Sequence, residues 1–353
     1  MEYLILYLVI LFFGLGYIFL KKEIFLKIIF IILTLFSGLR YKVGADYEGY
    51  EFIFSLLSSD IENYEIIRLE KGYYLLIKMI NLISGTQQLV FLIMAIISNY
   101  LIYKFIIESS RDKILSVFIF FLVGPYYSSG FNGIRQYLAI SLFLYSLKYL
   151  KNRKIFKYFF FIFLGFLFHK SCILLLPLYL ILNLKYSLKG KIFILILSSF
   201  VDYKLLPTIL NIFNYDIYNS IVIYRVNSNF YFLLLFLIFS IFILLYNEKN
   251  KSLNKIEENI NFYAIILLIL VFFNEKIYPY LNQIFLRMVT YFLFYYIIII
   301  PNFIEKVFKQ KKLIKNLFFI LISILYIKTF LIKLPDYQYN LKLFYQKEER
   351  YLK

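Results

Sequence analysis

Long apolar runs, repeated along the whole chain, constrain its fold more than any other feature of the sequence. Many of them approach the ~20 residues that an α-helix needs to cross a bilayer. Inside lipid, every backbone polar group must be satisfied within the protein, so such a chain spans the membrane as helices. The hydrophobic share of 62% exceeds the roughly 45–50% of soluble domains. We therefore predict an all-α, polytopic transmembrane helix bundle.

The apolar runs predict about 12 spans, within a range of about 11 to 14. They are expected near residues 2–20, 24–39, 88–107, 114–128, 131–150, 155–168, 171–184, 191–203, 229–246, 260–273, 284–301 and 313–333. We expect a single transmembrane domain over residues 1–333, followed by a charged C-terminal tail at 334–353. A single long helix over 155–184 is the alternative to two helices with a turn at His169–Lys170. It would put Lys170 inside the membrane at a cost of roughly 2.5–3.5 kcal/mol.

Lysine-rich loops set the orientation, because short cytosolic loops carry the excess of basic residues. The densest are 148–157 and 306–315. Alternation outward from these loops makes 40–87 and 203–228 extracytoplasmic. This alternation of loops holds only if residues 72–84 do not cross the membrane, so we predict an interfacial or re-entrant helix there.

The arginines follow a different distribution from the lysines. Six of the eight fall on the predicted outer side: Arg40, Arg68, Arg135, Arg225, Arg287 and Arg350. A guanidinium group fits phosphate in two-point contact, which a lysine ammonium does not. The sequence therefore predicts a phosphorylated ligand, bound in an outward-facing cavity.

Charge and composition also exclude some functions. A net charge of +18 suggests nucleic acid in a soluble protein, but here it lies mostly in short loops, where it faces membrane lipids. The single cysteine, Cys172, forms no internal disulfide, and a single histidine, His169, builds no histidine cluster. No Asp-x-Asp pair occurs. We expect no metal, no cofactor and no nucleic-acid partner.

The first outer cluster of polar residues lies in the segment 40–87. It comprises Arg40, Gly44, Asp46 and Tyr50, followed by Glu70, Gly72 and Tyr73. Glycines beside the arginine allow tight turns and a close approach of a ligand to the backbone. Alternatively, Arg40 and Asp46 form a solvated surface ion pair worth at most about 1 kcal/mol.

The second cluster, Asn132, Arg135 and Gln136, opens a predicted helix. The positive end of a helix attracts anions, and its free N–H groups add donors. An arginine gains nothing from the dipole there, so we expect a ligand or a carboxylate partner for Arg135. Its side chain could instead reach into the lipid headgroups.

Two further clusters complete the outer set. His169 is either a hydrogen-bonded structural residue or a general base, since its pKa lies near the working pH. Asn282 and Arg287 lie in apolar sequence, where an arginine needs a partner, a water-filled cavity or lipid phosphate. Arg225, in the segment 203–228, is a weaker candidate for this outer set of polar residues.

In this order, the clusters resemble the EpsG family of bacterial exopolysaccharide proteins, which is similar to the Wzy-type O-antigen and capsule polymerases. The resemblance spans roughly residues 35–295. The matching residues are Arg40, Gly44, Asp46, Tyr50, Glu70, Gly72, Tyr73, Asn132, Arg135, Gln136, Ala139, Phe168, His169, Ser171, Asn282 and Arg287. It implies a multi-pass protein of the bacterial cytoplasmic membrane that joins undecaprenyl-pyrophosphate-linked repeat units of O-antigen, capsule or exopolysaccharide on the outer side. The implied partners are the lipid-linked donor and acceptor glycans and a chain-length regulator.

The resemblance and the arginine distribution together suggest roles for the candidate residues. We expect Arg135 and Arg287 to bind the pyrophosphate with support from Arg40 and Arg225, in a metal-independent transfer. His169 is the first candidate for the base, with Asp46 and Glu70 as alternatives. The expected substrate contacts are Asn132, Gln136, Asn282, Tyr50 and Tyr73.

Other functions remain open from sequence. One is a flippase for lipid-linked oligosaccharides, although no two-fold repeat is visible and the polar residues inside spans gather outward. The others are an O-antigen ligase and a membrane acyltransferase, for which His169 would be the base.

Overall fold

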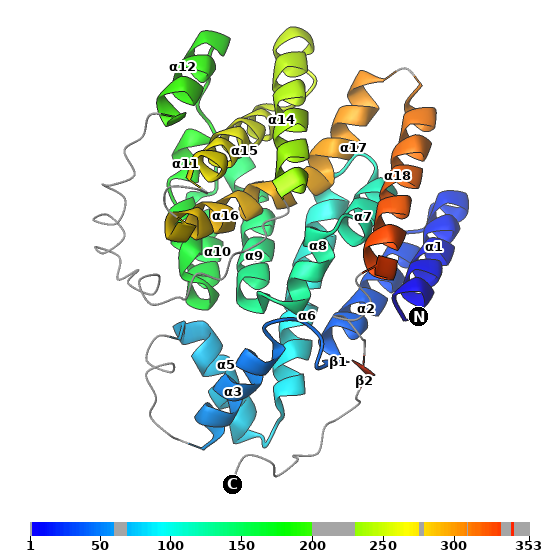
Figure 1. Cartoon of the computed structure of the whole chain (residues 1–353), viewed down its shortest axis with the longest axis vertical. Helices are drawn as coiled ribbons and strands as arrows, with labels where there is room; N and C mark the ends of the chain where they lie inside the picture. The colour runs from blue at the N-terminus through cyan, green and yellow to red at the C-terminus, as the bar shows by residue number, and fades with distance from the viewer. Residues whose placement is uncertain are drawn as a thin grey trace. The chain divides into compact units, whose positions relative to one another are not determined.

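The computed structural model describes residues 2–59, 69–199, 230–274, 279–308, 310–332 and 340–341. Over these ranges the protein is almost entirely helical, which confirms the all-α prediction (Figure 1). Its contacts divide the chain into two compact units. Unit 1 comprises Met1–Leu176 with Ile300–Lys353, and unit 2 comprises Pro177–Ile299. The single domain expected over residues 1–333 stays a prediction.

Most of the helices lie within the predicted apolar runs. Unit 1 contains α1 (Glu2–Leu20), α2 (Ile24–Gly38), α3 (Tyr47–Ser58), α5 (Lys71–Leu82), α6 (Gln87–Ser109), α7 (Lys113–Leu122), α8 (Pro125–Ser128), α9 (Ile134–Lys151), α10 (Ile155–Phe168), α18 (Lys311–Ile332) and the 3-10 helices η1 (Ser129–Phe131) and η2 (Lys170–Leu175). Unit 2 contains α11 (Leu178–Ile181), α12 (Leu188–Ser199), α14 (Phe230–Asn250), α15 (Lys255–Asn274) and α16 (Pro279–Phe294), while α17 (Tyr296–Val307) passes from unit 2 into unit 1.

Helix length limits how many spans the structure supports. Within the described ranges, three helices are long and apolar enough to cross a membrane: Glu2–Leu20, Gln87–Ser109 and Phe232–Asn250. The pair Ile284–Phe294 and Tyr296–Val307, bent by 42°, makes a fourth if it is one span. Several other runs form helices of only 10–17 residues. The structure is thus that of an all-α membrane protein, but it does not confirm about 12 spans.

The core of unit 1 is built around α6. Helices α2 and α9 both pack against it, and α10 packs against α9. Three buried polar side chains join these helices: the Tyr137 hydroxyl donates to Asn99 Oδ1 at 2.7 Å, and Asn99 Nδ2 donates to Ser37 Oγ at 3.3 Å. These two hydrogen bonds fix the start of α9 against α2 and α6.

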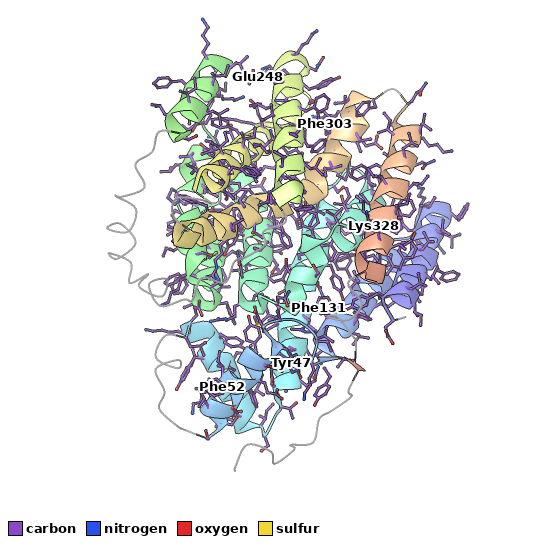
Figure 2. The ribbon with its side chains drawn as sticks, in the orientation of Figure 1. Tyr47, Phe52, Phe131, Glu248, Phe303 and Lys328 are labelled. Atoms are coloured by element: carbon purple, nitrogen blue, oxygen red, sulfur yellow. The ribbon has the colours of Figure 1, made fainter. Side chains whose placement is uncertain are left out.

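The segment 40–87 holds more regular structure than the predicted loop. It contains α3 as well as α5, which is the helix expected near residues 72–84. One face of α5 buries Tyr73, Ile77 and Ile80, while Leu82 near its end is 85% exposed. Aromatic rings pack between α3, α5 and α6: Tyr47, labelled in Figure 2, and Tyr50 both contact Phe91, and Tyr50 contacts Tyr73. An interfacial or re-entrant position for α5 stays a prediction.

Two short strands join the loop after α2 to the C-terminal tail. Strand β1 (Arg40–Tyr41) pairs antiparallel with β2 (Asn340–Leu341), with Arg40 opposite Leu341. The tail residues 340–341 therefore lie beside residues 40–41, and the sequence assigns both segments to the outer side.

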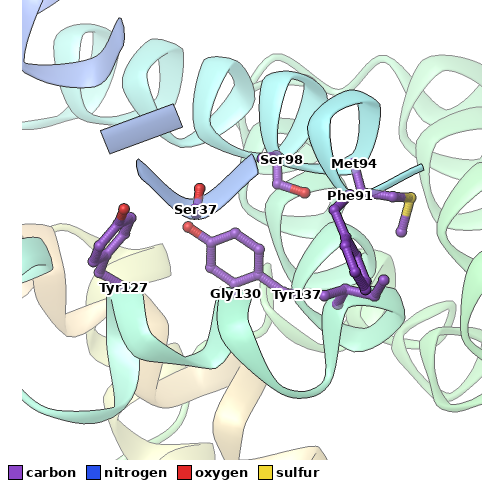
Figure 3. A pocket seen from close by; sticks show the side chains of 9 residues that line it. Ser37, Phe91, Met94, Ser98, Tyr127, Gly130 and Tyr137 are labelled. Carbon is purple, nitrogen blue, oxygen red and sulfur yellow. The ribbon is translucent and has the colours of Figure 1, made fainter. Parts of the chain in front are cut away.

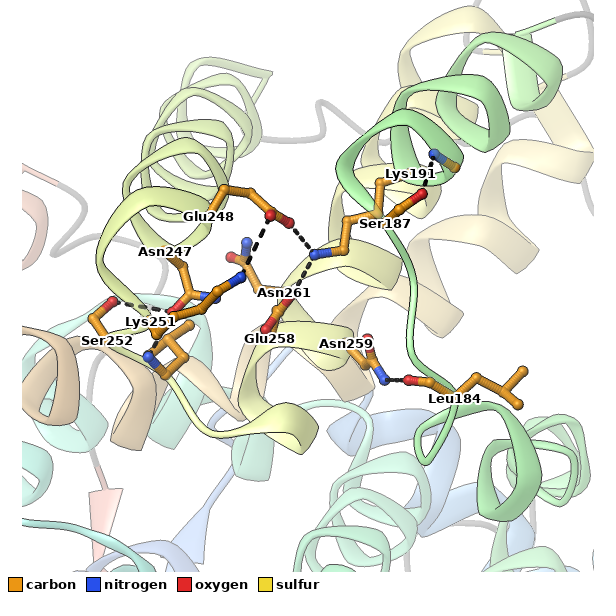
Figure 4. Close-up of polar contacts among 12 residues, drawn as sticks. Leu184, Ser187, Lys191, Asn247, Glu248, Lys251, Ser252, Glu258, Asn259 and Asn261 are labelled. Atoms are coloured by element: carbon orange, nitrogen blue, oxygen red, sulfur yellow. Dashed lines mark hydrogen bonds and ion pairs between the residues drawn. The ribbon is translucent and has the colours of Figure 1, made fainter.

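A charged cluster holds unit 2 together. The Lys191 side chain at the start of α12 is fully buried and forms ion pairs with Glu248 of α14 and Glu258 of α15 (Figure 4). A buried ammonium group is tolerated only with such partners.

Candidate functional site

The loop after α2 is held in place by Arg40. This side chain is 1% exposed, and three of its N–H groups donate to backbone carbonyls. Nη1 donates to Ser37 O at 2.6 Å, Nε to Val43 O at 3.2 Å and Nη2 to Phe131 O at 3.2 Å. The guanidinium also lies 4.4 Å from the centre of the Phe91 ring. Arg40 therefore joins the loop to the start of α9, and its expected contact with pyrophosphate stays a prediction.

Gly44 brings this loop against the residues that precede α9. Its φ of +105° is a glycine conformation, and a Cβ there would lie 2.3 Å from Phe131 O. Asn132 Oδ1 accepts a hydrogen bond of 2.7 Å from the Ala45 N–H. Asn132 thus positions the loop, and its predicted role as a substrate contact is not tested.

Gln88 is a residue that the sequence reasoning missed. It is 7% exposed in the first turn of α6, and its Nε2 donates to Gly38 O at 2.6 Å and to Arg40 O at 3.1 Å. The only signal in the sequence is a polar side chain at the start of an apolar run. Gln88 and Arg40 together fix the backbone of the first cluster.

Arg135, in the first turn of α9, has the carboxylate partner that its position predicts. Its Nη1 forms an ion pair with Glu70 Oε2, just before α5. The guanidinium carbon lies 5.9 Å from the centre of the Tyr50 ring and 5.6 Å from that of Tyr73. Both distances are typical of cation–π contacts. The structure therefore brings the first and second clusters together around one guanidinium group.

This guanidinium group is not fully satisfied. Arg135 Nε is buried and has no hydrogen-bond partner, although the side chain as a whole is 27% exposed. The Glu70 side chain is 11% exposed. An unmet buried donor is costly, and here it belongs to a cation that solvent reaches. The arrangement is suited to accepting an anion with several oxygen atoms.

The two tyrosines beside Arg135 act as donors rather than bases. Burial raises the pKa of both the Tyr50 and the Tyr73 hydroxyl, and the nearby Arg135 charge only partly opposes the shift. Because their ordinary pKa already lies near 10, both remain protonated at physiological pH. They can donate hydrogen bonds to an anion or a sugar oxygen.

His169 ends α10 with an extended backbone, which confirms the predicted break at this residue. The residues after it form η2, and the ring is 8% exposed. Its Nδ1 lies 2.6 Å from Ser171 Oγ. In the tautomer whose Nδ1 donates to Ser171, Nε2 is the unprotonated ring nitrogen, and only this tautomer can take up a proton at Nε2. Ser171, which the family resemblance included without a role, therefore bears on the candidate role of His169 as a base.

The start of α5 packs against the end of α10, close to His169 in the sequence. A Cβ at Gly72 would lie 2.8 Å from Leu167 O, so only glycine permits this approach. Phe168 packs against the cluster that contains Tyr73 and Ile134. Residues from the Glu70, Arg135 and His169 clusters are thereby gathered in unit 1.

Other candidates lie elsewhere or outside the described residues. Asp46 is the residue before α3, and its side chain is exposed. Gln136 follows Arg135 in α9 and is half-buried. Arg287, in α16 of unit 2, is half-buried; Asn282 belongs to the same helix, but its side chain lies outside the description. Arg225 lies outside the described residues. The expected meeting of Arg287 and Arg225 with Arg135 stays a prediction.

A small cavity lies in the core beneath the start of α9 (Figure 3). It measures about 10 Å³ and is lined by Ser37, Phe91, Met94, Ala95, Ser98, Tyr127, Gly130, Ile134 and Tyr137. Ser98 Oγ is buried there without a partner. The volume suits about one water molecule, so this is not a sugar site, and the outward-facing cavity stays a prediction. The described residues contain no group of three His, Cys, Asp or Glu side chains arranged for a metal.

The turn that carries His169 gives a stability prediction. A Cβ at Gly165 would lie 2.5 Å from Cys172 Sγ but 3.5 Å from Cys172 Cβ. We expect Gly165→Ala to lower the melting temperature of the purified protein, and Cys172→Ala to restore most of the loss in the double variant, because it removes the sulfur. Additive effects of the two changes would contradict this packing.

These features define a helical membrane protein that carries a partly exposed arginine–carboxylate pair at the start of a helix. A model of the EpsG family matches residues 23–346. The chain therefore belongs to the EpsG family, which is the family of Wzy-like polysaccharide polymerases, and the resemblance drawn from the motifs is confirmed. No curated protein and no solved structure matches the chain.

Proposed function

We propose that this protein joins undecaprenyl-pyrophosphate-linked oligosaccharide repeat units into a polymer, on the outer side of the bacterial cytoplasmic membrane. Membership of the EpsG family supplies the class of reaction, a Wzy-like polysaccharide polymerase. The observation that carries the proposal is Arg135, a partly exposed guanidinium group with one buried donor unmet and two protonated tyrosines beside it.

The reaction breaks the bond between the donor sugar C1 and a pyrophosphate oxygen, which leaves with the electron pair. A hydroxyl oxygen of the acceptor sugar forms the new bond to C1 and loses its proton to a base. Negative charge develops on the leaving pyrophosphate, and Arg135 stabilises it. Arg40 supports this site by holding the loop after α2 in place, and Arg287 and Arg225 stay candidate contacts from the sequence. Each charge-assisted hydrogen bond contributes about 1.5–3 kcal/mol.

His169 is the proposed base, in the tautomer whose Nδ1 donates to Ser171 and whose Nε2 accepts the proton. Glu70 and Asp46 are weaker alternatives for the base. Glu70 is paired with Arg135, and Asp46 is exposed to solvent. One base opposite a good leaving group favours direct displacement with inversion at C1. The hydroxyls of Tyr50 and Tyr73 and the amides of Asn132, Gln136 and Asn282 are the proposed sugar contacts.

The glycan phenotype of a deletion strain tests the function. Loss of a polymerase leaves single repeat units exported but unjoined, so a gel of surface glycan shows one band in place of a ladder. Loss of a flippase leaves the units facing the cytosol, and loss of a ligase leaves finished polymer on the lipid carrier. Loss of an acyltransferase leaves the ladder in place without acyl groups. Only the first outcome, reversed by the wild-type gene, agrees with the proposal.

A further inference from the structure

Glu70 is the residue before α5. Its backbone has the extended conformation usual at that position, with φ −65° and ψ 134°, and its side chain makes no capping hydrogen bond to α5. Side chains before a helix commonly accept hydrogen bonds from the free N–H groups of the first turn. The Glu70 carboxylate reaches Arg135 instead. Among the described residues, Glu70 forms the ion pair with that guanidinium group, at a donor where a phosphate oxygen would bind.

Glu70 and a pyrophosphate compete for the Nη1 donor of Arg135. The Glu70 oxygen takes this donor, which leaves the buried Nε unused. A ligand that binds Nη1 together with Nη2 must displace the carboxylate, and like charges then drive Glu70 away. Its side chain can turn to the N–H groups at the start of α5, where the helix dipole favours a negative charge.

We propose that Glu70 is a selectivity residue, which keeps the Arg135 site closed to monoanionic lipid headgroups and yields to a pyrophosphate. A phosphodiester headgroup carries one negative charge, the same as the carboxylate it would replace, and it gains little by displacing it. A pyrophosphate carries more charge and offers oxygens to two donors at once. The inference rests on the proposed function, because it assumes that Arg135 binds the pyrophosphate.

Binding measurements with two soluble probes test this role. The probes are farnesyl pyrophosphate and dihexanoyl-phosphatidylglycerol, titrated calorimetrically into the full-length protein in a zwitterionic detergent. The wild-type protein is expected to bind the pyrophosphate and to bind the phosphodiester at least about tenfold more weakly, a difference of about 1.4 kcal/mol. Glu70→Gln is expected to bind both probes, and the pyrophosphate about tenfold more tightly than the wild type.

Glu48→Gln is the matched control, because Glu48 is exposed in the first turn of α3. It is expected to bind both probes as the wild type does. Glu70→Asp keeps the charge and is expected to keep the phosphodiester excluded. Weaker or unchanged binding of both probes by Glu70→Gln overturns the inference.

Two further measurements separate this inference from the proposed function. Arg135→Gln is expected to bind neither probe. If this variant still binds farnesyl pyrophosphate, the proposed contact between Arg135 and the pyrophosphate is wrong. If Arg135→Gln loses binding while Glu70→Gln gains none, only the role of Glu70 is wrong. If Glu70→Gln fails to fold, a competition experiment with the wild-type protein takes its place. Displacement of bound farnesyl pyrophosphate by an equimolar amount of dihexanoyl-phosphatidylglycerol would overturn the inference.

Discussion

Replacing Arg135 by alanine is expected to abolish polymer while leaving the protein in the membrane. The change removes the cation that we propose to stabilise the leaving pyrophosphate, and loss of one such group commonly costs about 10²–10³ in rate. Since the Arg135 side chain is partly exposed, we expect the fold to tolerate its removal better than the loss of a core residue. A surface-glycan gel measures the polymer, and an immunoblot of membranes measures the protein.

Arg153→Ala is the matched control. Arg153 is exposed in the turn between α9 and α10, and its loss is expected to leave the glycan ladder unchanged. Arg287→Ala is expected to behave like Arg135→Ala. Arg135→Lys keeps the charge without the planar fork and is expected to retain only part of the activity. Polymer of normal length in both alanine variants would refute the proposed pyrophosphate contact.

Replacing Gly44 by alanine is expected to remove most of the folded protein from the membrane. The positive φ costs a residue with a Cβ about 1–3 kcal/mol. The added atom would also lie 2.3 Å from Phe131 O, a backbone atom that Arg40 holds in place. Because both elements are fixed, the loop must leave its site on the start of α9. The melting temperature of purified protein and its abundance in membranes measure the effect.

Gly49→Ala provides the comparison for this variant. Gly49 lies within α3, and a Cβ there meets nothing within 4 Å. Alanine is favoured over glycine in a helix by about 1 kcal/mol, so this variant is expected to be as stable as the wild type or slightly more so. A Gly44→Ala protein that melts like the wild type would contradict the docking of the loop.

Two residues show where reasoning from the sequence ends. The position of Arg135 at a helix start predicted a carboxylate or ligand partner, but nothing in the sequence selected Glu70, which is 65 residues away. The sequence makes Arg40 a candidate ligand contact but does not reveal the three backbone carbonyls to which the structure joins it. Carbonyl acceptors are present at every residue, so they leave no sequence signal.

The sequence by itself determined the all-α membrane class, the position of most helices and the break at His169. These properties depend on hydropathy and on local preferences of the backbone, which neighbouring residues encode. The tertiary structure alone decided that Glu70, Tyr50 and Tyr73 surround Arg135, and that Gly44 lies against Phe131. Such contacts join residues far apart in the chain, and they depend on how whole helices pack rather than on any local pattern.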